Sequence, residues 1–449
     1  MSQGFKKSLI ALSVSGLLMS PLAQATNGYF AHGYSTKEKG LAGAGVAHSQ
    51  DALASATNPA GLVNVGERMD MGAALFNPNR EYSVSGTPAG GPLILNGGVP
   101  GTNESSHDVF LIPHFGYTMK LDDTSVFGIA AYGNGGMNTD YENVAPPAGF
   151  PTPSGTFGAG AAGVDLKQLF INATYAKTLD DKHSVGASVI FAYQMFKAHG
   201  LASFGGWGGG GFDLSTDDAN LSDRGDDTSM GFGAKLGWQG KVTPEVTLGA
   251  SYQTKMAMSE FDKYKGLFAE QGDFDIPATM ILGAAWDIDD KRKLVVDIQQ
   301  IYYSDVASIG NPMMPNLGIC QLGGNNQDPN CLGGSNGAGF GWDDMTVIKL
   351  GYEWLQNDMT LRVGYSQGDH PISDSEVMFN ILAPAVIEQH LTFGMTMPMG
   401  SNNELSVAAM YAFEGDVSGP NMYDGMGTGQ RVELAMDQFE IQASYTMKF

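Results

Sequence analysis

The last residues of the chain, 439–449, read FEIQASYTMKF and alternate strictly between apolar and polar side chains. A period of two places neighbouring side chains on opposite faces of an extended strand, and helical spacing does not fit it. The same alternation runs through residues 405–413, 387–397 and 185–193. We therefore expect each of these segments to be a β-strand with one apolar and one polar face.

Working back toward the N-terminus, about 14 segments show this pattern. No segment after the first 25 residues has the 18 or more continuous apolar residues that a membrane-spanning helix needs. The expected strands start near Glu67, Asp108, Ser125, Asp165, Ser184, Thr228, Glu245, Phe274, Lys293, Asp343, Met359, Pro384, Leu405 and Met436.

The connections between these segments are alternately short and long. Short polar turns fall at residues 121–124, 180–183, 243–244, 289–292, 356–358 and 400–403. Segments rich in Gly, Pro, Asn and Asp separate them, at residues 85–107, 138–164, 201–227, 258–273, 305–342, 369–383 and 415–435. An antiparallel transmembrane barrel with short periplasmic turns and long external loops has this rhythm. A β-sandwich or a propeller gives no reason for it.

The sequence therefore predicts an all-β protein, a 14-stranded antiparallel transmembrane β-barrel. The apolar face of each strand would contact lipid and the polar face would line the lumen. An even strand number puts both termini on one side, expected to be the periplasm, and the aromatic Phe449 at the end of the last strand is typical of outer-membrane barrels. The polar face would then place these side chains in the lumen: Lys235, Asp297, Gln299, Lys349, Glu353, Arg362, Glu388 and His390.

The first 25 residues read as a secretory signal peptide. Lys6 and Lys7 precede an apolar stretch, and Ala23-Gln24-Ala25 is a small-x-small cleavage site. We expect three regions: a signal peptide at 1–25, an N-terminal segment at 26–66 and the barrel at 67–449. Export to an oxidising compartment makes a disulfide between Cys320 and Cys331 the expected state of the two cysteines.

Composition excludes several classes of protein. The formal net charge of −23 argues against nucleic-acid binding, which requires a basic surface. Two cysteines exclude a disulfide-dense scaffold and a multi-cysteine zinc module. The acidic residues of the third long loop, between Asp213 and Asp227, fit no EF-hand spacing, so we expect a solvated loop and no metal site.

The segment 26–66 has no alternating pattern and contains closely spaced glycines at 40, 43 and 45, followed by Asn58-Pro59-Ala60. Small residues allow close packing, and a lumen of about 14 strands is wide enough to need filling. Residues 28–63, GYFAHGYSTKEKGLAGAGVAHSQDALASATNPAGLV, resemble the hatch of the FadL/TodX family of outer-membrane transporters of long-chain fatty acids and hydrocarbons. The resemblance extends over essentially the whole mature chain. Taken as a turn alone, Asn58-Pro59 would only lead into the first strand.

The resemblance implies passive uptake of hydrophobic compounds, long-chain fatty acids or hydrocarbons, without a cofactor. The ligand would pass from an apolar groove among the loops to a pocket near the hatch, which lies inside the lumen, and leave sideways through the wall at a kink in the third strand. A monomer is implied, with a hydrophobic small molecule, outer-membrane lipid, lipopolysaccharide and the barrel assembly machinery as partners. The hatch motif would be Asn58, Pro59 and Ala60.

The residues for these steps can be suggested from the sequence. Gly favours bulges, so Gly133, Asn134, Gly135 and Gly136 are candidates for the kink, although the strand can equally end there. Substrate-binding candidates are Tyr29, Phe30, Leu201, Phe204, Trp207 and Phe212, the last four of which can instead pack loop against loop. No basic partner for a carboxylate can be assigned; Arg224, Lys255 and Arg362 are the possibilities.

Two other functions stay open. The first is a porin for small polar solutes, with the N-terminal segment outside the lumen. The second is an esterase, because residues 364–368 match G-x-S-x-G around Ser366, although that motif requires a strand–turn–helix context. The expected position at the end of a barrel strand argues against an enzyme, and no catalytic residue is assigned.

Overall fold

The computed structural model of the chain describes residues 27–86, 95–106, 108–145, 154–206, 213–323, 325–422 and 429–449. The predicted signal peptide lies outside the described residues. So do two of the substrate-binding candidates, Trp207 and Phe212.

The strands form one closed antiparallel barrel, as the alternation predicts. In the described part of the chain, fourteen long strands follow one another around the ring, and the last pairs with the first along its whole length, from Arg68↔Lys448 to Ser85↔Arg431. Two short strands, β2 (Gly101–Glu104) and β9 (Ala257–Met258), pair with the outer parts of β1 and β7. The fourteen are β1 (Arg68–Ser85), β3 (Phe110–Lys120), β4 (Ser125–Tyr141), β5 (Ala162–Thr178), β6 (His183–His199), β7 (Asp227–Lys241), β8 (Val246–Gln253), β10 (Thr279–Asp289), β11 (Arg292–Ile301), β12 (Met345–Gln356), β13 (Met359–Gly368), β14 (Gln389–Pro398), β15 (Asn403–Pro420) and β16 (Arg431–Lys448).

The last strand shows why the pattern closes into a barrel. Along β16 buried and exposed residues alternate, with Phe439 and Ile441 exposed and Gln438, Gln442 and Thr446 buried. The apolar face therefore points outward and the polar face points into the lumen, the arrangement of a barrel immersed in lipid.

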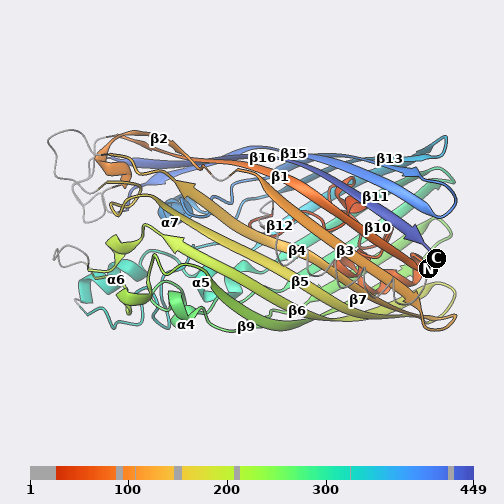
Figure 1. Cartoon of the computed structure of the whole chain (residues 1–449), viewed down its shortest axis with the longest axis horizontal. Helices are drawn as coiled ribbons and strands as arrows, with labels where there is room; N and C mark the ends of the chain where they lie inside the picture. The colour runs from red at the N-terminus through yellow and green to blue at the C-terminus, as the bar shows by residue number, and fades with distance from the viewer. Residues whose placement is uncertain are drawn as a thin grey trace.

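The two ends of the barrel differ. In Figure 1 the long loops with their small helices lie at the left end, and the short turns lie with the C-terminus at the right end. Phe449 and the start of β1 meet there, because the amide of Phe449 donates to the carbonyl of Glu67 at 3.1 Å. We call these the loop end and the turn end.

The helices are all short. None in the described part of the chain is long and apolar enough to cross a membrane. Three lie in the N-terminal segment: α2 (Thr36–Lys39), α3 (Ala54–Thr57) and η1 (Pro59–Asn64). The others lie in the long loops: η2 (Leu95–Gly98), η3 (Ala202–Phe204), η4 (Asp218–Asn220), η5 (Asp262–Tyr264), α4 (Ala269–Gly272), η6 (Tyr303–Asp305), α5 (Ala307–Gly310), α6 (Asn316–Gly323), η7 (Asp374–Glu376) and α7 (Val377–Asn380).

Residues 27–66 lie inside the barrel and fill its turn-end half, where Figure 1 shows them in red among the strands. We call this segment the plug. Its backbone packs directly on glycines of the wall: a Cβ on Gly364 would come within 2.3 Å of the amide nitrogen of Ala42, and one on Gly249 within 2.2 Å of the carbonyl oxygen of Val46. Five more wall glycines meet the plug in the same way: Gly116, Gly186, Gly237, Gly351 and Gly394. These seven wall glycines thus allow a folded segment to fit inside the barrel.

Two strands begin later than the alternation predicts. The apolar runs near Phe274 and Pro384 were expected to start strands, but β10 begins at Thr279 and β14 at Gln389. Phe274 and the residues after Pro384 are instead buried among other apolar side chains at the loop end. An apolar run that enters a core and one that faces lipid look alike in a sequence.

Replacing Gly364 by Val should displace the plug without unfolding the barrel, because the new side chain would overlap the backbone of Ala42. We expect single-channel conductance in planar bilayers to rise, since water would enter the turn-end half. Ala443→Val, on the lipid-facing side of β16, is the control and should leave conductance at the wild-type value. Equal conductance of both variants would contradict this account of the plug.

Candidate functional site

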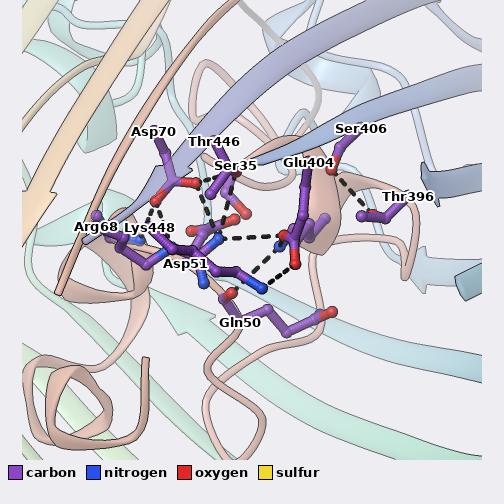
Figure 2. Close-up of polar contacts among 12 residues, drawn as sticks. Ser35, Gln50, Asp51, Arg68, Asp70, Thr396, Glu404, Ser406, Thr446 and Lys448 are labelled. Atoms are coloured by element: carbon purple, nitrogen blue, oxygen red, sulfur yellow. Dashed lines mark hydrogen bonds and ion pairs between the residues drawn. The ribbon is translucent and has the colours of Figure 1, made fainter. Parts of the chain in front are cut away.

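The plug is held in the turn-end half by ion pairs to the wall (Figure 2). The Lys37 ammonium contacts Glu404 of β15 at 2.6 Å, and the Lys39 ammonium contacts Glu440 of β16 at 2.5 Å. Arg68 on β1 donates to Asp70 at 2.8 Å, and a carboxylate oxygen of Asp70 accepts the plug amide of Ala52 at 2.9 Å. Buried charges of this kind are tolerated only when they are paired and hydrogen-bonded.

Further contacts attach the plug to the other side of the ring. Asp297 of β11 accepts the backbone amides of Gly45 and Val46 at 2.8 and 3.0 Å. The Lys349 ammonium of β12 donates to the carbonyl of His32 at 2.9 Å. Arg362 of β13 donates to the side chain of Gln50 at 2.7 Å. Arg362, considered above as a partner for a ligand carboxylate, is thus engaged by the plug and the wall.

The three residues of the proposed hatch motif lie in the plug beside β7. The Asn58 amide donates to the carbonyls of Val46 at 2.6 Å and Trp238 at 3.0 Å, and its side-chain oxygen accepts the amide of Ala60 at 3.1 Å. Pro59 occupies the first position of η1, where a missing N–H costs nothing. The motif is therefore both a turn and a cross-link between the plug and the wall.

The loop-end half has the opposite chemistry. Strand ends and loops there surround a small apolar cavity with a volume of about 30 Å³. Ser308 has the one polar side chain among the described residues that line it, and its hydroxyl donates to the carbonyl of Asp273 at 2.5 Å. The lining residues are Val164, Phe196, Leu201, Phe204, Leu267, Phe268, Ser308, Leu332, Ala338, Gly339, Phe340, Phe379 and Leu382.

Aromatic rings connect this cavity to the start of the plug. Phe268 in the cavity wall lies 4.8 Å from Phe274, which lies 6.2 Å from Tyr29. On the other side, Phe340 lies 6.0 Å from Trp342, which lies 6.0 Å from Tyr29. These centroid distances are those of packed aromatic pairs. A continuous row of packed aromatic side chains, which we call the apolar path, therefore connects the cavity to the plug.

Tyr303, at the start of a long loop, fixes the first turn of the plug. Its hydroxyl donates to the carbonyl of Asn27 at 2.5 Å and accepts the amide of Tyr29 at 3.2 Å. Gly28 between them has φ +65, and a Cβ there would lie 2.4 Å from the Tyr303 oxygen. Glycine therefore meets both the backbone conformation and the close approach at this position.

The turn then pairs with the wall at an irregular place in β4. Phe30 forms an antiparallel bridge with Gly135, the Ala31 amide donates to Asn134 at 2.9 Å, and the Gly136 amide donates to Tyr29 at 3.0 Å. A Cβ on Gly135 would lie 1.8 Å from the Tyr29 carbonyl oxygen. Glycine at this position is required for the contact between the plug and the wall.

The same part of β4 has a β-bulge and leaves its neighbour. The register with β5 shifts between Gly133 and Gly135, which places the extra residue at Asn134. The ladder with β3 ends at Phe115↔Ala131, although β3 continues to Phe110 beside β1. Residues 130–137 of β4 are all buried, so this stretch bends inward. We call the place where β3 and β4 stop pairing the β3–β4 split.

The structure gathers the predicted substrate-binding and kink residues that it describes into this half of the lumen. Leu201 and Phe204 line the cavity, and Tyr29 and Phe30 lie at the inner end of the aromatic path beside the four residues 133–136. Five further residues lie on the aromatic path but were not expected as site residues from the sequence: Phe268, Phe274, Tyr303, Phe340 and Trp342. Their signal was the presence of large aromatic residues in otherwise Gly- and Asn-rich loops.

The remaining chemistry is structural. Ser366 of the G-x-S-x-G match lies within β13, and its hydroxyl contacts Nδ1 of His390 at 3.1 Å with both side chains buried. That is not the strand–turn–helix context of a hydrolase elbow. Cys320 and Cys331 form a disulfide. Among the described residues, no group of three or more His, Cys, Asp or Glu side chains could hold a metal ion.

Comparisons with known proteins agree with this architecture. Residues 16–446 match the family model for outer membrane protein transport proteins (OMPP1/FadL/TodX), and the chain belongs to this family of outer-membrane transport proteins. No curated protein matches the sequence.

Solved structures with the same fold have little sequence identity to this chain. The Pseudomonas putida toluene transporter TodX is similar with a TM-score of 0.63 and 18% identity over 93% of this chain and 99% of that one. A Pseudomonas aeruginosa FadL homologue gives 0.64 and 15%, over 94% and 100%. The Ralstonia pickettii toluene transporter TbuX gives 0.61 and 17%, over 93% and 99%.

Removing the Tyr303 hydroxyl should loosen the first turn of the plug. Tyr303→Phe loses two hydrogen bonds, each worth about 1 kcal/mol, so amide exchange at Phe30 and Ala31 should accelerate by roughly tenfold or more. Hydrogen–deuterium exchange read by mass spectrometry measures this. Tyr302→Phe, one residue away, is the control, and unchanged exchange in Tyr303→Phe would show that the hydroxyl does not fix the turn.

Proposed function

We propose that this protein is an outer-membrane channel for the passive uptake of hydrophobic compounds, and that its ligand leaves sideways through the barrel wall at the β3–β4 split. The loop end would face the outside and both termini the periplasm, with lipid and lipopolysaccharide around the wall. The observation that carries the proposal is the apolar path from the loop-end cavity to the place where Phe30 pairs with Gly135.

The difference in polarity between the two halves of the lumen favours a ligand route through the barrel wall over a route straight through the plug. An apolar solute is favoured in hydrocarbon over water by about 0.8 kcal/mol for each CH₂ group. In the turn-end half such a solute would meet paired charges, among them Lys39 with Glu440. Passing between the two would separate the pair and leave buried charges without partners, which is costly. The lipid beyond the split offers it an apolar solvent. The solvation free energy of an apolar ligand is therefore more favourable toward the barrel wall than toward the plug.

The start of the plug is suited to act as the gate. The plug start covers the inner side of the split through three backbone contacts at residues 134–136. From the loop end, the Tyr303 hydroxyl holds it through a hydrogen bond to Asn27. Backbone pairing at a single bulge is local and can open without unfolding the ladder between β4 and β5. A ligand that displaces Tyr29 and Phe30 would reach the split directly.

Two relatives in the comparison are toluene transporters by name, and one is a FadL homologue. Both toluene and fatty acids are therefore appropriate first probes. A porin is less well supported, because the plug fills the turn-end half. An esterase is less well supported, because the Ser366 and His390 side chains are buried.

Blocking the contact at Gly135 tests the route. We expect cells that express the protein to take up labelled toluene or labelled oleate faster than cells without it. We expect Gly135→Val to lower that uptake several-fold, because the new side chain would project into the space between the plug start and β4 through which the ligand must pass. Ala173→Val, on the lipid-facing side of β5, should keep wild-type uptake. Uptake independent of the gene would refute the function, and full uptake by Gly135→Val would refute the sideways route.

Filling the cavity tests the binding step separately. Ala338 is buried in the cavity wall, so Ala338→Trp should occupy the space where a ligand would sit. We expect uptake to fall while the contacts of the plug with β4 stay protected from hydrogen exchange. Undiminished uptake in this variant, with the protein correctly inserted, would move the binding site elsewhere.

A further inference from the structure

Among the described residues, the lining of the loop-end cavity offers no cation to pair with a negative charge. Its lining is apolar except for Ser308, whose hydroxyl is already donated to the carbonyl of Asp273. Every Lys and Arg of the sequence after Lys7 falls within the described ranges, and none of them lines this cavity. A carboxylate that entered would lose its water and gain no cation in return.

Three lysines near the loop end are paired with acidic residues outside the cavity. Lys255 contacts Asp275 at 2.9 Å, Lys265 contacts Asp262 at 2.7 Å, and Lys167 contacts Asp165 at 2.7 Å. Lys255, one of the basic residues considered in the sequence, is thus neutralised by an acid. These side chains balance acidic loops and do not extend a positive field into the cavity.

Arg80 lies at the inner end of the path, where it lines a small space with Gly28 and Trp342. Its guanidinium donates to the Pro78 carbonyl at 3.0 Å and to the Ser105 hydroxyl at 2.9 Å. On its other side it borders a second cavity lined by five acids: Glu81, Glu104, Asp108, Glu414 and Asp437. Acidic residues therefore lie on one side of its positive charge.

Carboxyl groups also flank the path itself. Phe274, which links the cavity to Tyr29, lies between Asp273 and Asp275 in the chain, and the Asp275 carboxylate accepts the amide of Met258 at 2.8 Å. Burial, with Asp275 and Glu270 adding to it, raises the pKa of Asp273 to about 7. A raised carboxyl pKa reports a site that already disfavours negative charge. Burial and the nearby carboxyl groups would disfavour a ligand anion beside Asp273 as well.

We propose that the cavity selects uncharged apolar molecules and excludes carboxylates, so that neutral hydrocarbons and not fatty-acid anions are the substrate class of this protein. The inference rests on the proposed function and specifies its substrate. The determinants are the absence of a cation among the described lining residues and the carboxyl of Asp273 beside the path. The exclusion is electrostatic and does not depend on the length of the ligand.

The test uses two ligands of equal chain length, labelled decanol and labelled decanoate, with labelled toluene as a third probe. Uptake is measured at neutral pH in a Gram-negative strain that lacks its own channels of this family. Wild-type protein should give gene-dependent uptake of decanol and toluene that exceeds uptake of decanoate at least tenfold.

A gain-of-function pair identifies the cause. Leu267 is partly exposed at the cavity wall, so Leu267→Lys can place an ammonium there while its stem packs on apolar surface. We expect Leu267→Lys to raise decanoate uptake several-fold relative to Leu267→Met, which has similar length and no charge. Asp273→Asn should also raise decanoate uptake without changing that of toluene.

The outcomes separate the two proposals. Gene-dependent uptake of decanoate equal to that of decanol in the wild type would overturn the selectivity and leave the channel function standing. Loss of that decanoate uptake in Arg80→Gln would then assign the carboxylate to Arg80. No gene-dependent uptake of any of the three probes would refute the channel function itself. Decanoate uptake that is the same in Leu267→Lys and Leu267→Met would refute the electrostatic cause.

Discussion

The filling of the lumen is the constraint on which the rest of this structure depends. Fourteen strands enclose a space that their own side chains cannot fill, so a separate segment must occupy it. Residues 27–66 do so at the turn end, where their backbone approaches wall glycines such as Gly364 and their charges pair with the wall, as Lys39 does with Glu440. The close approach requires glycine on the wall, and the burial requires partners for every charge.

The division of the lumen into a polar half and an apolar half follows from that filling. The plug brings paired charges to the turn end, while the loops close the other end with aromatic residues around a cavity. Because apolar solutes gain only in apolar surroundings, the boundary between the halves is where a ligand on the proposed route would stop or turn. The plug start, Tyr303 and the bulge at Asn134 all lie at this boundary. A loop, the plug and the wall are therefore coupled at one place.

Much of the fold could be predicted from the sequence, because a period of two is local and repeated. The fourteen strands and the closed antiparallel ring were expected, and the structure and the family match confirm them. The predicted strand starts were wrong where an apolar run enters a core, as at Phe274. The periodicity of a sequence does not show whether an apolar side chain contacts lipid or protein. The site could be predicted only in part. Tyr29 and Phe30 were suggested by resemblance, while Tyr303 and Trp342 are distant in sequence from both and carry no local pattern.

The sequence by itself determined the class of the protein: alternating strands, short and long connections in turn, and a glycine-rich segment before the first strand. Those features depend on neighbours along the chain. Only the tertiary structure decided that Phe30 pairs with Gly135, that Tyr303 holds Asn27, and that the cavity lacks a cation. The first two are contacts across the lumen between residues far apart in the chain. Phe30 and Gly135 are separated by 105 positions, and Asn27 and Tyr303 by 276. Ring closure brings them together, and no property of a single segment encodes it.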